Sequence, residues 1–314
     1  MLLNCLNNSN EDWSYTSGRQ RRATEDNSVR GEESQMTWAD LPGISIRYEL
    51  SGQGPNSLIL LHELGGSLES FDACIDGLED GNRILRYDQR GAGFSEKPRA
   101  SFTLTDHVAD LLALTDVLGL KPPYRLLGVA AGAAIAASLA IANPDLVEAL
   151  ILCSPALGTV PERQVYLMQR SAMAEEKGMR AIADATLERS YPQSFREDEK
   201  AYQTYLARFL ANDPVAYGHA NRALTEAKLT SQLDRITAPC LVLAGAHDVL
   251  RPKSEMLDIC NRLPRGEFAE VLSGHLMPVQ APGELVAETR RFLASLEESP
   301  AGGLQRSPTG GNPE

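Results

Sequence analysis

Short runs of apolar residues, bounded by turn residues, recur along this chain and predict the strands of a sheet. Residues 44–50 alternate between apolar and polar and predict a strand buried on one face. Residues 58–61 form a continuous apolar run, which is typical of a parallel strand covered on both faces. Further strands are predicted at residues 83–87, 126–127, 147–153, 240–244 and 267–272.

Apolar residues at helical spacing predict helices between these strands. Val108, Leu111, Leu112 and Leu118 share one helical face, with Thr105 or Asp106 as the N-cap and Gly119 as the stop. Other helices are predicted at residues 133–142 and 285–296. Alternating strands and helices predict the α/β class, with a doubly wound and mostly parallel sheet.

The strand pattern disappears between residues 159 and 233. This segment instead contains three helical patches, separated by Pro192 and Pro214, at residues 163–176, 178–189 and 197–210. We therefore predict a helical cap at 159–233, inserted into a core formed by 36–158 and 234–298.

Both ends of the chain differ in composition from this core. Residues 1–35 are polar and without periodicity, and predict a disordered extension, with Met36 as an alternative candidate start. Gly, Pro and Ser dominate residues 299–314, which predicts a disordered tail.

The charge balance of the chain argues against two kinds of partner. Lys and Arg number 30 and Asp and Glu 42, which gives a net charge of −12. An acidic surface disfavours nucleic acids and anionic membranes. No apolar run reaches the roughly 18–20 residues of a membrane span, and the first residues lack the pattern of a secretory signal. A small-molecule substrate is the expected partner, and the oligomeric state stays open.

The cysteines indicate a reducing compartment. They are odd in number and unclustered: Cys5, Cys74, Cys153, Cys240 and Cys260. None forms a CxxC pair or has zinc-ligand spacing with a histidine. We therefore expect a cytoplasmic protein without disulfides, metal or cofactor.

The sequence Gly128-x-Ala130-x-Gly132 has the form of G-x-S-x-G, a turn between strand and helix that displays a nucleophile. The middle residue here is an alanine. Because a methyl group cannot attack a carbonyl, an acyl-enzyme formed through position 130 is excluded.

Chemically useful side chains follow several other predicted strands. His62, Glu63 and Leu64 follow one strand, while Asp248 and His275 follow the last two. In an open parallel sheet, ligands bind beyond the carboxyl ends of the strands. The order elbow, acid, histidine is also the chain order of the α/β-hydrolase triad.

From about residue 44 to residue 296 the chain resembles the α/β-hydrolase fold superfamily. The elbow, Asp88-x-Arg90-Gly91-x-Gly93-x-Ser95, Gly245-x-x-Asp248 and Gly274-His275 carry this resemblance. The cap and residues 236–252 are most similar to enol-lactonase-like members, which act on small carboxylated ring-cleavage products. The chain also resembles aminoacrylate hydrolases, a family that tolerates alanine at the elbow.

The resemblance implies a role for each matching residue. His275 would be the general base and Asp248 the carboxylate that orients it. The backbone N–H groups of Leu64 and Ala131 would form the oxyanion hole. Residues expected near the pocket are His62, Glu63, Cys153 and Ser154, the last two as unreactive lining.

Glu63 departs from the resembled motif, which usually has glycine after the histidine. We expect its side chain to point outward to a surface base. Facing inward, it would repel an anionic substrate, favour a cationic one or hold a water. His107, His219 and His247 receive no catalytic role. Residues 88–95 are interpreted as a structural turn.

Three functions are compatible with Ala130. The favoured one is a hydrolase in which His275 and Asp248 activate water directly against a reactive enol-lactone, enamine or activated ester. The second is a catalytically dead homologue that binds a small ligand or partner. The third is a serine hydrolase with an engineered Ser-to-Ala change. The same histidine could also serve as the base of a lyase or cofactor-free oxygenase.

Overall fold

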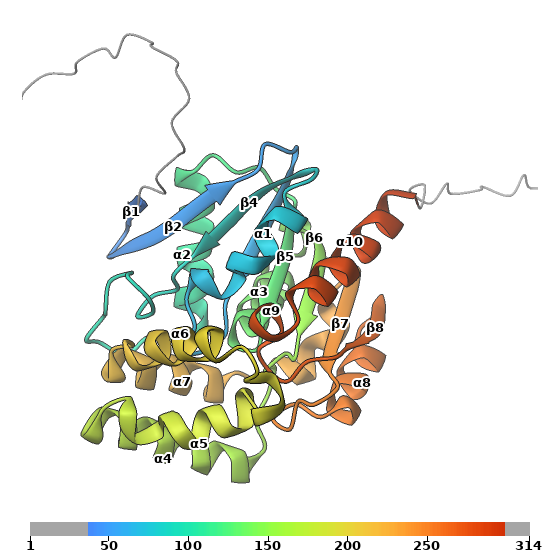
Figure 1. The fold of residues 1–314 in the computed structure, drawn as a ribbon. Coiled ribbons are helices and arrows are strands. Elements are labelled where there is room, and N and C mark those ends of the chain that lie inside the picture. The colour runs from blue at the N-terminus through green and yellow to red at the C-terminus, as the bar shows by residue number, and fades with distance from the viewer. Residues whose placement is uncertain (1–36, 299–314) are drawn as a thin grey trace, which may run out of the picture. The chain divides into compact units, whose positions relative to one another are not determined.

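The computed structural model describes residues 37–298, so the expectations for residues 1–35 and 299–314 lie outside the described part. Its centre is an eight-stranded sheet in the order β1-β2-β4-β3-β5-β6-β7-β8 (Figure 1). The strands are β1 (Thr37–Leu41), β2 (Ile44–Ser51), β3 (Asn56–Leu61), β4 (Asn82–Tyr87), β5 (Tyr124–Val129), β6 (Val147–Cys153), β7 (Cys240–Gly245) and β8 (Gly266–Val271).

Six of these strands, from β4 to β8 in spatial order, are parallel, whereas β1 and β2 pair antiparallel at one edge. The chain runs from β3 to β4 on one side and then crosses to β5 on the other. Leu61 at the end of β3 is in register with Gly128 in β5. Ligand sites of open sheets lie at such a switch point, so the loops after β3 and β5 meet where a ligand is expected.

Helices bury both faces of the sheet. One face packs against α2 (Leu104–Val117), α3 (Ala131–Ala142) and α8 (Lys253–Arg262). The other face packs against the 3₁₀ segment η1 (Leu68–Cys74) and against α1 (Ile75–Leu78), α9 (Met277–Gln280) and α10 (Pro282–Glu298). The doubly wound α/β architecture predicted from the alternating pattern is therefore confirmed.

Four further helices form the cap. They are α4 (Pro161–Lys177), α5 (Arg180–Ser190), α6 (Glu199–Leu210) and α7 (Pro214–Glu226), with short 3₁₀ segments η3 (Gln193–Phe195) and η4 (Leu229–Arg235). Figure 1 shows them together beyond the end of the sheet. The cap is not separated from the core as a compact unit, so the division into two domains stays a prediction.

The structure corrects several predicted boundaries. The sequence predicts a break at Pro214, but this residue is the first of α7, where its missing N–H costs nothing and Asp213 supplies the N-cap. Thr103 rather than Thr105 or Asp106 caps α2; Asp106 is the third helical residue of a capping box. Strand β1 and helices α1, α7, α8 and α9 match none of the predicted elements.

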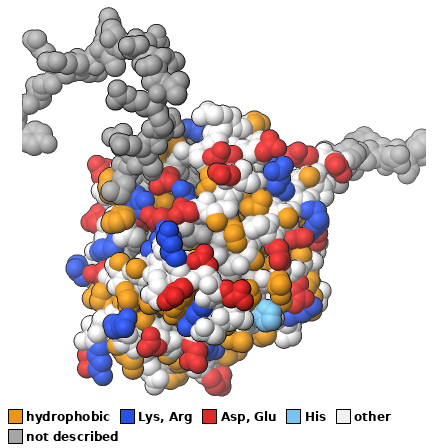
Figure 2. Space-filling view, viewed as in Figure 1, with side chains coloured by type: hydrophobic (Ala, Val, Ile, Leu, Met, Phe, Trp, Pro, Cys, Tyr) orange, Lys and Arg blue, Asp and Glu red, His pale blue; other side chains and the backbone are white. Residues whose placement is uncertain are grey.

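The surface of the described residues mixes both signs of charge. On the face drawn in Figure 2, acidic and basic side chains are interspersed with apolar ones. Between residues 37 and 298, every helix is either too short or too polar to cross a membrane.

Candidate active site

Asp248 and His275 come from the loops after β7 and β8, and the two loops are tied together. The backbone N–H of His247 donates to the carbonyl of Ser273 at 2.9 Å. Gly245 allows this close approach, because a Cβ there would meet the carbonyl oxygen of Gly274 at 2.2 Å. The result is a hydrogen bond of 2.8 Å between His275 Nδ1 and Asp248 Oδ2.

Asp248 is held as a buried carboxylate. Its other oxygen, Oδ1, accepts hydrogen bonds from the backbone N–H groups of Leu250 at 2.8 Å and Arg251 at 3.0 Å. Burial opposes its ionisation, but the interactions with His275, with Ser154 and with the backbone N–H of Arg251 together outweigh burial, so the pKa of Asp248 is lowered. The nearby Ser154 hydroxyl contributes to the lower pKa without the geometry of a full hydrogen bond.

Because Asp248 accepts from Nδ1, the proton of a neutral His275 is on Nδ1 and the Nε2 lone pair is free. The His275 side chain is 12% exposed and lines a cavity between the sheet and the cap. This is the orientation that a general base requires.

Ala130 has the strained backbone of a nucleophile elbow. Its φ is 48° and its ψ is −101°, a conformation that costs a non-glycine residue about 1–3 kcal/mol. Its N–H donates to the carbonyl of Cys153 and its carbonyl accepts from the N–H of Ala156. A Cβ on Gly132 would meet the carbonyl oxygen of Leu61 at 2.0 Å, so the turn is packed tightly against β3. The turn therefore keeps the strained geometry of an elbow, although residue 130 has no hydroxyl.

Two backbone N–H groups beside the elbow are available to a ligand. Within residues 37–298, neither the N–H of Leu64 nor that of Ala131 donates to another group of the chain. Both residues line the cavity. Ala131 is also the first residue of α3, whose N-terminal N–H groups attract negative charge.

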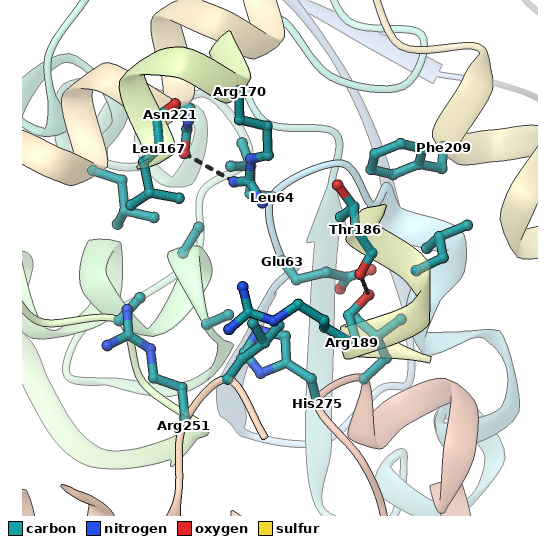
Figure 3. Close-up of a pocket in the computed structure, with 18 of the residues that line it drawn as sticks. Glu63, Leu64, Leu167, Arg170, Thr186, Arg189, Phe209, Asn221, Arg251 and His275 are labelled. Carbon is teal, nitrogen blue, oxygen red and sulfur yellow. Dashed lines mark hydrogen bonds between the residues drawn. The ribbon is translucent and has the colours of Figure 1, made fainter. Parts of the chain in front are cut away.

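The cavity lies between the sheet and the cap (Figure 3) and has a volume of about 110 Å³. This is small beside the roughly 300–1,000 Å³ of drug-sized sites. Its floor contains Glu63, Leu64, Ala130, Ala131 and His275, and all four cap helices contribute to its wall. A small molecule would therefore be enclosed by the two parts of the fold together.

Glu63 faces this cavity, which corrects the expectation that it points outward to a surface base. It is 2% exposed, and its Oε1 accepts hydrogen bonds from Ser70 Oγ and Tyr205 Oη, both at 2.9 Å. Tyr205 belongs to the cap helix α6. Burial and the neighbouring Glu63 charge raise the pKa of Tyr205, so the phenol stays a donor. The second oxygen of Glu63, Oε2, is buried without a partner among the described residues.

Three other residues expected near the pocket lie elsewhere. His62 is buried, its Nε2 accepts from the backbone N–H of Gln89, and it lines a separate cavity of about 20 Å³. Cys153 and Ser154 are fully buried and do not line the cavity between the sheet and the cap. Cys153 instead packs in the core, where burial raises the pKa of its thiol.

The remaining histidines have structural surroundings. His107 is buried in α2, and burial lowers its pKa to about 3. His219 contacts the carbonyl of Arg99, while His247 is exposed and packs against Phe195. Among residues 37–298 there is no cluster of acids, cysteines and histidines suited to a metal ion.

Sequence reasoning missed the cap residues of the site. Arg163, Tyr166, Leu167 and Arg170 recur at helical spacing along α4, and all four line the cavity. That spacing was visible in the sequence. Without the arrangement of the cap, however, nothing distinguished the face that lines a cavity from one that meets solvent.

The fold and this site together define an α/β hydrolase. The model of the family described as "alpha/beta hydrolase fold" matches residues 56–282, and the chain belongs to that family.

Several characterised relatives are similar along most of their length. The 3-oxoadipate enol-lactonase 2 of Acinetobacter baylyi is 27% identical over 241 residues, which cover 76% of this chain and 89% of that protein. The crystal structure of the enol-lactonase from Burkholderia xenovorans LB400 superposes with a TM-score of 0.78 at 25% identity, covering 82% of this chain and all of that one. A malate-bound thermophilic esterase from Thermogutta terrifontis also gives a TM-score of 0.78 at 25% identity, covering 84% and 99%.

Proposed function

We propose that this protein hydrolyses a small reactive substrate, such as an enol-lactone, enamine or activated ester, with water activated directly by His275 and Asp248. The observation that carries the proposal is the 2.8 Å hydrogen bond between His275 and Asp248 at the edge of the enclosed cavity. Similarity to two enol-lactonases and an esterase supports a hydrolase that acts on activated acyl or vinyl compounds.

The site offers a role for each step of ester or lactone hydrolysis. A water in the space above the Ala130 methyl attacks the carbonyl carbon, while His275 Nε2 takes one of its protons. The negative oxygen that forms accepts hydrogen bonds from the N–H groups of Leu64 and Ala131. The bond to the leaving oxygen then breaks, and the imidazolium of His275 returns its proton to that oxygen.

This route needs a substrate that is already reactive. Sites that lose triad members keep roughly 10³–10⁴-fold catalysis over water from the oxyanion hole and binding. An enol leaving group, or an enamine that hydrolyses unaided, has a low enough barrier for the remaining groups to matter. The barrier to hydrolysis of a stable amide is too high for these groups alone.

The strain at Ala130 supports turnover over simple ligand binding. A binding protein gains nothing from holding an alanine at a φ of 48° beside two free N–H groups. The strained backbone aims the N–H of Ala131 into the cavity, which is useful where negative charge develops on a substrate oxygen.

An activity screen tests the proposal. Enol-lactones, enamines and activated phenyl esters are offered to the wild type, His275→Ala and Ala130→Ser. We expect His275→Ala to lower kcat/KM on the best substrate by roughly 10²–10⁴-fold, the range for loss of a general base. Equal rates for wild type and His275→Ala would overturn water activation. Ligand-dependent thermal stabilisation without any product would favour a binding protein.

A further inference from the structure

Glu63 lines the cavity, and the second oxygen of its carboxylate makes no hydrogen bond within the described chain. Oε1 already accepts from Ser70 and Tyr205, whereas Oε2 is buried and without a partner among residues 37–298. Gly66 makes room for this carboxylate, since a Cβ there would meet Oε1 at 2.2 Å. A buried acceptor left without a donor is unfavourable, so the fold holds Glu63 in a state that a hydrogen-bond donor would improve.

A residue of the cap also has a buried polar atom without a hydrogen-bond partner in the described chain. Thr186, on α5, lines the same cavity, and its Oγ1 is also buried without a partner in the described chain. Figure 3 shows the Glu63 side chain pointing from its loop toward the cap helix that carries Thr186. Glu63 Oε2 can only accept a hydrogen bond and the Thr186 hydroxyl can accept or donate one, so both can bind an N–H group.

The cap also supplies positive charge to the cavity wall. Arg170 and Arg189 both line the cavity, and neither has an ion-pair partner among residues 37–298. Arg170 is held by a 3.1 Å hydrogen bond to Asn221 Oδ1, and its Nε is a buried donor without a partner. By contrast, Arg163 and Arg251 are both paired with Glu255.

From this distribution we propose that Glu63 and Arg170 determine substrate specificity. The site would select a small molecule with a carboxylate at one end and an N–H donor, neutral or cationic, at the other. Arg170, assisted by Arg189, binds the carboxylate, because guanidinium groups match carboxylates in charge and geometry. Glu63 Oε2 accepts from the nitrogen. This inference rests on the proposed function, because it names the class of substrate that His275 would help to hydrolyse.

The proposal also explains why the floor of the cavity contains a carboxylate, that of Glu63. Glu63 and Leu64 line the same cavity, and a carboxylate there disfavours negative charge on a bound substrate. It favours a substrate whose nitrogen is, or becomes, positively charged. Of two substrates of equal reactivity, the one that carries an N–H group opposite Glu63 should therefore bind more tightly.

Binding of three matched probes tests this without any turnover. γ-Aminobutyrate carries both groups, while butyrate and butylamine each carry one of them on a four-carbon chain. Dissociation constants are measured from thermal stabilisation at millimolar concentrations, with the wild type and with His275→Ala. We expect γ-aminobutyrate to bind about tenfold or more tightly than either single-ended probe. Persistence of this preference in His275→Ala separates the specificity claim from the hydrolytic one.

Variants of Glu63 and Arg170 show which residue binds each end of γ-aminobutyrate. Glu63→Gln, which keeps the acceptor for Ser70 and Tyr205, should lower γ-aminobutyrate affinity to that of butyrate and leave butyrate unchanged. Arg170→Gln should lower it to that of butylamine. Arg222→Gln, a cap arginine with its own partner in Glu175 at 2.6 Å, is the matched control and should change neither. Equal binding of the three probes by the wild type, or no binding of any, would overturn the proposal even if a variant failed to fold.

Discussion

The elbow at Ala130 and the loop of residues 62–66 meet on the floor of one cavity, and they depart from the usual hydrolase pattern in opposite ways. The elbow has lost its reactive hydroxyl but keeps its strained backbone. The loop has gained the Glu63 carboxylate, but its Leu64 N–H still has no acceptor within the part of the chain that the structure describes. At the elbow, Gly132 packs against the backbone of β3, so the turn keeps its shape without a hydroxyl. In the loop, Gly66 packs against the Glu63 carboxylate, so the loop is built around that side chain.

The largest expected effect comes from breaking the hydrogen bond between Asp248 and His275, because both loops would act on a substrate together with this pair. Asp248→Asn puts an amide where His275 needs an acceptor, which favours the wrong tautomer of the imidazole. We expect kcat/KM on the best substrate to fall by roughly 10³–10⁴-fold with the fold intact. Asp234→Asn, an exposed position, is the control. A loss no larger than that of the control would mean that Asp248 does not orient the base.

Adding a hydroxyl at position 130 tests whether the elbow alone limits ester hydrolysis. Ala130→Ser places Oγ on the strained turn, within the surroundings of a serine hydrolase. We expect hydrolysis of activated phenyl esters to rise by about 10²-fold, part of the rate that a complete triad contributes. Ala134→Ser, a buried position in α3, adds the same hydroxyl away from the cavity. No gain over that control would show that the elbow and His275 are misaligned.

Much of the fold could be predicted from the sequence, but only part of the site. Strand β6 has the bounds that its apolar run predicted, and the carboxyl-end rule brought Asp248, His275 and the elbow together. The direction of Glu63 could not be predicted, because one of its partners, Tyr205, is 142 positions away in the cap. The arginines of the wall depend in the same way on how the cap helices pack.

Acid dependence of stability gives a smaller effect with a definite sign. The folded pKa of Asp248 is lowered, so its contribution to the free energy of unfolding is present above its unfolded pKa of about 3.9. That contribution is lost as the pH falls through the lower folded value. We expect Asp248→Asn to lose less stability than the wild type between neutral and strongly acidic pH in urea titrations. Parallel pH curves would contradict the assignment.

The smallest predicted effect concerns the strained turn alone. Ala130→Gly replaces a side chain that disfavours a φ of 48° with one that tolerates it. We expect the free energy of unfolding to change little or rise by about 1 kcal/mol. Ala137→Gly, a buried position within α3, should instead lose about 1 kcal/mol or more. Equal losses in urea unfolding would show that Ala130 carries no strain.

The central claim, that water attacks directly and no covalent intermediate forms, is tested by intact-protein mass spectrometry during turnover of an activated ester. The wild type should release product while its mass stays unchanged at every time point. Ala130→Ser should gain the mass of one acyl group, which shows that the method detects an intermediate when one forms. An acyl adduct on the wild type that accumulates and decays at the rate of turnover would contradict the account.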